Sequence, residues 1–267
     1  MISVTSAQLD AWLVAFFFPL ARILGLMATA PIFNNAALPA RVRLIAGLAI
    51  AIALAPALPP MPAIPAGSWL GLMVLAQQVL IGILMGFTLR IAFAAIDLAG
   101  ELIGLQMSLS FAVFYDPGSS GQTPVVTEFL GLLASLIFLA INGHLLTLGA
   151  LAESFHLLPV GVAPPAAQGL WALLAWSAAL FSMGLLLSLP VVGALLIANI
   201  ALGVLARVAP QLNLFSVGFP VTIVAGFVML GLFLPYFGAA LQSLFDHSFE
   251  ALRGLLLAAG GAIAGGR

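Results

Sequence analysis

The sequence predicts an all-α membrane protein, and its composition, its long uncharged runs and its proline breaks all point to that class. Of its 267 residues, 64% are hydrophobic and 6% are charged, and the mean hydropathy is +1.27. A soluble domain carries about 25% charged residues, so this chain has too few to cover a water-facing surface. We expect six or seven hydrophobic helical segments, several of them broken or kinked, in a single membrane domain over residues 1–267.

The first half of the chain contains three apolar segments. A hydrocarbon core about 30 Å thick needs roughly 20 apolar helical residues. Charge-poor runs predict helices over about 12–33, 44–58 and 69–96. Five prolines between Pro56 and Pro65 end the second segment, because proline lacks the N–H group that continues a helix.

Longer uncharged runs fill the second half. Residues 129–152, 154–206 and 208–245 contain no Asp, Glu, Lys or Arg. The middle run is long enough for two spans, or for one long helix kinked at Pro190. Near the N-terminus the acidic Asp10, rather than a basic region, precedes the apolar stretch, so we expect no cleavable signal peptide.

Several function classes are excluded by what the chain lacks. A net charge of −1 provides no field that would hold nucleic acid. The absence of cysteine excludes disulfides, thiolate metal sites and cysteine nucleophiles. Walker, G-x-S-x-G and H-E-x-x-H motifs are missing, and the histidines lack metal-ligand spacing. We therefore expect no enzyme activity, no cofactor, no metal and no nucleic-acid partner.

Arginines interrupt the apolar segments. An arginine at the bilayer centre costs about 2.5–3.5 kcal/mol on insertion scales. Arg22 and Arg90 must therefore contact a neighbouring subunit, line an aqueous path, or extend to the membrane surface from a tilted helix. By the positive-inside rule, Arg41 with Arg43 favours a cytoplasmic first loop, and Arg207 favours a cytoplasmic late loop.

Acidic and small residues mark the third segment and the region after it. Asp97 and Glu101 are four residues apart on one helical face, where like charges repel unless they are solvated, protonated or matched by an arginine. Two pairs of glycines with the same spacing predict close approach between helices. These pairs are Gly82 with Gly86 and Gly100 with Gly104.

An apolar and aromatic stretch then leads into a turn. It begins at Gln106 and Met107, continues through Phe111, Phe114 and Tyr115, and reaches the turn residues Asp116 and Pro117. Such a segment cannot face lipid, because its backbone polar groups would be unsatisfied, so it must be buried in protein or line a water-filled cavity. Phe111 and Phe114 would form a hydrophobic constriction able to gate a pore.

Three blocks of sequence resemble the FliR family, a membrane subunit of the flagellar type III protein-export gate. The blocks cover residues 16–56, residues 100–126 continuing to 138–161, and residues 190–227. Their prolines, arginines and glycine-rich turn match the family's pattern. Ser108 is a departure, because the family commonly has glycine there.

The resemblance implies assembly with FliP and FliQ, and beside FlhB, into a helical pore complex in the bacterial inner membrane, at the flagellar basal body. The segment Gln106–Gln122 would be a plug in this pore, with Phe111 and Phe114 as its aromatic pair, and unfolded flagellar subunits would pass through. Charges would then meet partner chains or an aqueous lumen. On this basis we assign subunit packing or a buried charge to Arg22, Arg41, Arg43, Asp97, Gly100, Glu101, Gly104 and Arg207.

Three alternatives remain open at the level of sequence. The chain could be the homologous subunit of a virulence injectisome, because the two systems share these motifs. A small-solute secondary transporter would need a binding site at broken helices and often an internal repeat, and no convincing repeat is present. A purely scaffolding subunit without contact to the pore is the third alternative.

Overall fold

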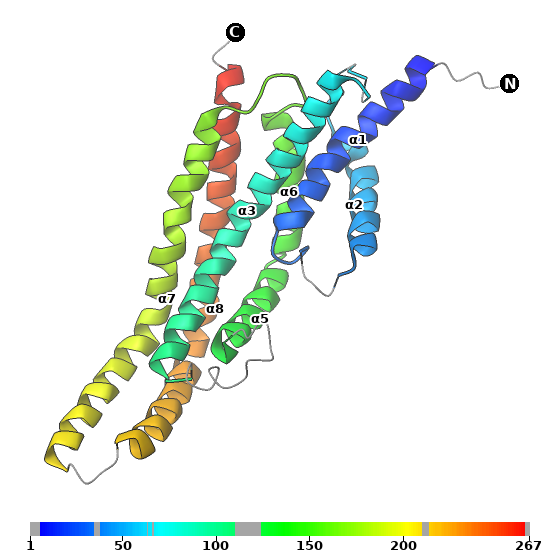
Figure 1. Ribbon diagram of the computed structural model, residues 1–267. Helices are drawn as coiled ribbons and strands as arrows, with labels where there is room; N and C mark the ends of the chain where they lie inside the picture. The colour runs from blue at the N-terminus through cyan, green and yellow to red at the C-terminus, as the bar shows by residue number, and fades with distance from the viewer. Residues whose placement is uncertain are drawn as a thin grey trace. The chain divides into compact units, whose positions relative to one another are not determined.

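The computed structural model describes residues 6–34, 38–62, 64–65, 67–109, 124–209 and 214–264. These residues form helices joined by short connections and contain no strand (Figure 1). The helices are α1 (Ser6–Thr29), α2 (Ala40–Leu54), the 3-10 helix η1 (Ala55–Ala57), α3 (Trp69–Gln106), α5 (Val125–Ala140), α6 (Gly143–Leu157), α7 (Ala167–Val208) and α8 (Leu214–Ala264). The prediction of an all-α membrane protein with six or seven helical segments is confirmed.

Among the described residues, four helical stretches are long and apolar enough to cross a membrane. They are Ala40–Ala57, Trp69–Gln106, Ala167–Val208 and Gly218–Gly261. The broken pair α5 and α6 makes a fifth if its two parts form one span. In α1, the part whose side chains are described contains the apolar helix Val14–Thr29.

The positions of the helix breaks differ in part from the sequence expectation. Of the two alternatives for residues 154–206, the structure has one long helix, α7, which contains Pro190. In contrast, the uncharged run 129–152 is divided, because α5 ends at Ala140 and α6 begins at Gly143. Asn142 between them has a φ of 58°, a left-handed conformation that asparagine tolerates better than most residues.

The third helix is longer than its apolar segment. Its predicted end was near residue 96, but α3 continues to Gln106. Asp97 and Glu101 lie within this extension, and both are exposed. Because both residues are exposed, the two carboxylates on one face do not end the helix.

The chain forms two compact units. Unit 1 comprises Met1–Ile91, Asn142–Ser177 and His247–Arg267, and unit 2 comprises Ala92–Ile141 and Ala178–Asp246. Helices α3, α7 and α8 contribute one part to each unit. A single domain over residues 1–267 stays a prediction.

In unit 1, α1 crosses the first half of α3 with the two backbones in direct contact (Figure 1). A Cβ atom at Gly82 would overlap the backbone oxygen of Arg22, and one at Gly86 would overlap the α1 backbone further along. In the other direction, a Cβ at Gly25 would overlap the backbone oxygen of Val79. The close approach predicted for Gly82 and Gly86 is confirmed.

In unit 2, three aromatic rings join three helices. Phe93 of α3, Phe138 of α5 and Phe245 of α8 have ring centroids 5.7, 5.3 and 5.1 Å apart, pair by pair. These distances are typical of favourable edge-to-face and tilted aromatic pairs. Helix α7 packs closely as well, because a Cβ at Gly184 would lie 2.8 Å from the backbone oxygen of Ala95. Unit 2 is thus held together by apolar contacts.

Candidate functional site

The candidate site is the part of unit 2 that holds both ends of residues 110–123. Helix α3 ends at Gln106, which is half-buried, and α5 begins at Val125. We use the name segment frame for the last turn of α3, the first turn of α5 and the part of α8 packed against them, around Gly226 and Leu230. The predicted plug residues in between lie outside the described residues. They are Phe111, Phe114, Tyr115, Asp116 and Pro117.

The end of α3 is closed by a Schellman motif. Ser108 has a φ of 63°. Its N–H donates to the carbonyl of Leu105 at 3.0 Å, and the N–H of Leu109 donates to the carbonyl of Gly104 at 3.0 Å. These two bonds satisfy carbonyls that a helix end otherwise leaves free. The motif therefore fixes the direction in which the chain leaves α3.

Met107 anchors this helix end against α8. Its side chain is fully buried. Gly226 provides the space, because a Cβ there would overlap the Met107 side chain, whose Cε would lie 2.6 Å away. Methionine is flexible and polarizable, which suits it to fill such a confined gap. The first end of the segment is thus held by both backbone hydrogen bonds and packing.

The other end of the segment, at the start of α5, lies against the α3 glycines. A Cβ at Gly100 would lie 2.5 Å from the Cα of Thr127, and one at Gly104 would lie 3.9 Å from the side chain of Val126. The Thr127 hydroxyl is buried and has no hydrogen-bond partner. Small residues on α3 therefore allow α5 to begin directly beside the end of α3.

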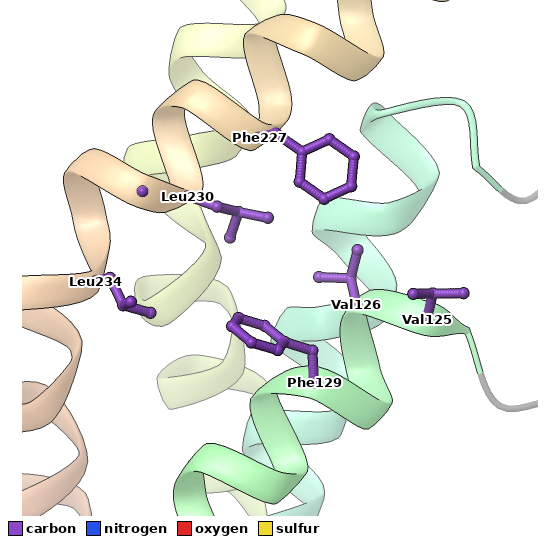
Figure 2. A pocket seen from close by; sticks show the side chains of 7 residues that line it. Val125, Val126, Phe129, Phe227, Leu230 and Leu234 are labelled. Atoms are coloured by element: carbon purple, nitrogen blue, oxygen red, sulfur yellow. The ribbon is translucent and has the colours of Figure 1, made fainter.

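An apolar pocket of about 310 Å³ opens between α5 and α8 within the segment frame. Its lining residues are Val125, Val126, Phe129, Phe227, Leu230, Gly231 and Leu234. Figure 2 shows Phe129 of α5 pointing toward Leu230 and Leu234 of α8, with Phe227 beside the opening. This lining offers hydrophobic contact and contains no acid, base or nucleophile, so it suits apolar binding rather than chemistry.

The other charges singled out in the sequence have separate positions. Asp97 and Glu101 are exposed on α3, and Arg207 is exposed in the last turn of α7, where a cation stabilises the negative end of a helix dipole. In unit 1, Arg41 is exposed near the start of α2 and Arg90 is exposed on α3. All five residues are exposed in the isolated chain.

Arg43 and Arg22 are bonded within unit 1. Arg43 donates to Asn34 Oδ1 at 2.8 Å and to the carbonyl of Leu38 at 3.1 and 3.2 Å, which ties the α1–α2 connection to α2. Arg22 is fully buried and hydrogen-bonds to Gln78 of α3 and to the end of α6. The sequence leaves a neighbouring subunit, an aqueous path and the membrane surface open for Arg22, and assigns it to subunit packing or a buried charge; in the structure the charge is buried and its hydrogen-bond partners belong to its own chain.

Within the described parts of the chain, no group of three or more His, Asp or Glu side chains is placed to hold a metal ion. Sequence reasoning missed Gln78 and Ser154, the two side chains that accept hydrogen bonds from Arg22. The signal for Gln78 was available, because Gln77 and Gln78 interrupt the apolar first part of α3.

Comparison with known proteins decides the family. A family model described as "Bacterial export proteins, family 1" matches residues 13–248. The chain is 42% identical to the flagellar biosynthetic protein FliR of Escherichia coli K12, over 96% of this chain and 98% of that protein. The chain belongs to the FliR family. FliR of Pectobacterium carotovorum is 43% identical over the same shares, and FliR of Bacillus subtilis is 30% identical over 92% of this chain and 96% of that protein.

Membership in the FliR family confirms the resemblance seen in the three sequence blocks. Together with the apolar helices, it makes the chain a membrane-embedded protein of the flagellar export family. The structure also bears on Ser108, where the resemblance predicts glycine. That residue occupies the left-handed position of the Schellman motif, which glycine adopts without strain and serine does not.

Proposed function

We propose that this chain is a membrane subunit of the flagellar type III export gate and that it forms the export pore with FliP- and FliQ-like subunits, beside an FlhB-like subunit. Residues 106–122 act as a plug that seals the pore until unfolded flagellar proteins are exported. The chain works without catalysis or cofactor, as a multi-pass protein of the bacterial inner membrane, within the flagellar basal body. The observation that carries the proposal is the match to the FliR family over nearly the whole chain.

The segment frame supports the role of the plug. A plug must be held at both ends and must present apolar side chains to the pore. The Schellman motif at Ser108 and the buried Met107 fix one end, and the Gly100–Thr127 contact fixes the other. Between these two ends lies the stretch that contains Phe111 and Phe114. Aromatic side chains in a narrow pore block ions by excluding water.

Exposed apolar side chains support assembly with other membrane subunits. Phe181, Leu186 and Ile197 of α7 are 69%, 64% and 71% exposed. Lipid can cover such side chains only where they lie within the hydrocarbon core. Helix α7, at 42 residues, would extend about 63 Å at 1.5 Å per residue, which is twice the thickness of a hydrocarbon core of about 30 Å. The surplus length needs protein partners to cover it.

The plug is tested by replacing both Phe111 and Phe114 with Ala, or by deleting residues 110–116, in the assembled gate. We expect leakage of ions or small molecules across the membrane, measured as loss of membrane potential or as dye entry. Phe87→Ala is the matched control, because it makes the same truncation at an exposed position of α3 in unit 1, away from the segment frame. Unchanged permeability in a verified assembled complex would contradict the plug.

The partners are tested by affinity purification of the chain in mild detergent. FliP- and FliQ-like chains should be recovered with it. A solitary monodisperse protein would count against the pore complex. Solute uptake by the purified chain alone in liposomes would favour a transporter instead.

The flagellar branch is favoured over the injectisome branch by the curated relatives, which are named flagellar biosynthetic proteins. Complementation separates the two. The gene should restore swimming motility to a strain of its own species that lacks it, with secretion of virulence effectors unaffected. Normal motility of that deletion strain together with loss of effector secretion would assign the chain to an injectisome.

A further inference from the structure

Arg22 is the most deeply buried cation in the described part of the chain, and each of its N–H groups has an acceptor. Nε donates to Gln78 Oε1 at 2.9 Å, and Nη2 donates to the same oxygen at 2.5 Å and to the carbonyl of Leu158 at 2.8 Å. Nη1 donates to the carbonyl and the hydroxyl of Ser154 at 2.8 and 3.0 Å. A guanidinium has five N–H donors, so none is left over.

Three of these five bonds end on the last turn of α6 and the residue after it. Ser154 lies in that turn, and Leu158 is the residue that follows the helix. The Ser154 carbonyl also accepts from the N–H of Leu158 at 2.9 Å, so Arg22 takes its second lone pair, and the helix end carries a partial negative charge of about half an electron. The guanidinium also lies over the ring of Phe155, 4.1 Å from its centroid, a favourable cation–π distance.

All the acceptors of Arg22 are uncharged oxygens. The positive charge is therefore balanced by the negative end of α6 and by the Phe155 ring rather than by hydrogen bonds to a carboxylate. An isolated charge at zero exposure would cost several kcal/mol, so this arrangement is stable only with α6 in place.

Packing of α1 against α3 does not satisfy Arg22. The glycine contact between these helices brings Arg22 beside Gln78, which accepts two of the five N–H bonds. The remaining three need α6, which follows Arg22 by more than 120 residues. The α1–α3 pair by itself would therefore leave a partly bonded guanidinium in an apolar setting.

We propose that Arg22 is the C-terminal cap of α6, supplied from α1, and that it makes the burial of α1 conditional on the docking of α6. This role of Arg22 is independent of the pore function proposed above, because it concerns the packing of α1 with α6 in unit 1 and not the passage of substrate through the gate.

Hydrogen exchange of the full-length chain, purified in detergent with any subunits that accompany it, tests the cap. In Arg22→Lys, a single ammonium cannot reach Gln78, Ser154 and Leu158 together, because lysine lacks the planar fork. Amides of residues 154–161 should exchange about a hundredfold faster, equivalent to about 2.7 kcal/mol at 1.36 kcal/mol per decade. Arg22→Met should produce a similar acceleration there, because it also removes the cap.

The matched control is Arg90→Lys, the same change at an exposed position of α3, which should leave every rate within threefold of wild type. Amides of α5, in unit 2, should keep wild-type rates in all variants. Wild-type exchange at residues 154–161 in both Arg22 variants would overturn the cap. If these variants do not fold, Ser154→Ala removes only one acceptor, and about tenfold faster exchange is expected; an unchanged rate there would overturn the proposal as well.

Discussion

The Arg22 cluster of unit 1 and the segment frame of unit 2 are built on the same kind of glycine contact but differ in what lies beside it. We define the Arg22 cluster as Arg22 with the partners Gln78, Ser154, Phe155 and Leu158. At Gly82 the close approach is accompanied by five charged hydrogen bonds. At Gly100 it is accompanied by a buried hydroxyl with no partner.

The difference indicates what each region tolerates. In the Arg22 cluster every guanidinium N–H group has an acceptor, and the buried atom without a partner is Gln78 Nε2, so removing an acceptor leaves a buried charge with an unpaired N–H group. In the segment frame the buried contacts are apolar, so a lone hydroxyl only adds a desolvation cost. Removal of an acceptor of Arg22 should therefore destabilise unit 1, whereas removal of the Thr127 hydroxyl should stabilise unit 2. Four substitutions test this contrast, measured as the free energy of unfolding of the purified chain in mixed micelles.

Gly82→Ala should have the largest effect. Its new Cβ would overlap the backbone oxygen of Arg22, so α1 and α3 must separate and the Arg22 cluster must open. We expect a loss of about 3 kcal/mol or more, at or above the upper end for overpacking, because backbone atoms cannot move aside. Gly149→Ala is the matched control, because nothing lies within 4 Å of its Cβ, and a gain of about 0.5–1 kcal/mol is expected in a helix. Equal effects would contradict the close crossing.

Gln78→Leu should cost about 3 kcal/mol, because two guanidinium N–H groups lose their acceptor while the charge stays buried. Gln77→Leu makes the same change one residue earlier, where a single neutral bond to the carbonyl of Ala163 is lost, and should cost about 1 kcal/mol or less. If the Gln78 variant has a free energy of unfolding as high as that of the Gln77 variant, Arg22 does not depend on its hydrogen bonds to Gln78.

Thr127→Val should stabilise the chain by about 1.5 kcal/mol, because it replaces a buried, unpaired hydroxyl with a methyl group of similar size. Thr147→Val is the matched control. The Thr147 hydroxyl is also buried but donates to the carbonyl of Gly143 at 2.8 Å. This variant should be less stable than Thr127→Val, and the opposite order would refute the contrast between the two units.

Ser108→Gly should give the smallest change, a gain of about 1 kcal/mol, because glycine adopts the left-handed conformation of Ser108 without strain. Ser135→Gly, in the interior of α5, should instead lose about 0.5 kcal/mol from lower helix propensity. A loss of stability in Ser108→Gly would show that the serine side chain contributes more than its backbone conformation costs.

Much of the fold could be predicted because it depends on local composition. Long uncharged runs identified the helices, and the start of α3 at Trp69 coincides with the expected segment. The spacing of Gly82 and Gly86 predicted the α1–α3 contact. The break at Asn142 was missed, because the Asn-Gly pair lies in an uncharged run that charge alone cannot divide.

The candidate site was predictable only in part. Turn residues and aromatic residues after Gln106 identified the segment, but the pocket between α5 and α8 joins residues about a hundred positions apart, and no local pattern indicates such a pairing. The same holds for Arg22, because its acceptors lie 56, 132 and 136 residues away. A sequence shows that a buried cation needs partners, and only the packing of distant helices selects them.

The sequence by itself determined that this protein lies in a membrane and that it is helical, because hydrophobicity and charge are sums over residues. It also determined the family, because the matching motifs lie along nearly the whole chain. Only the tertiary structure decided that Arg22 closes onto α6, that Met107 fills the space beside Gly226, and that residue 108 is left-handed. Hydrogen bonds and close packing depend on distances between atoms, and those distances exist only after distant segments have come together.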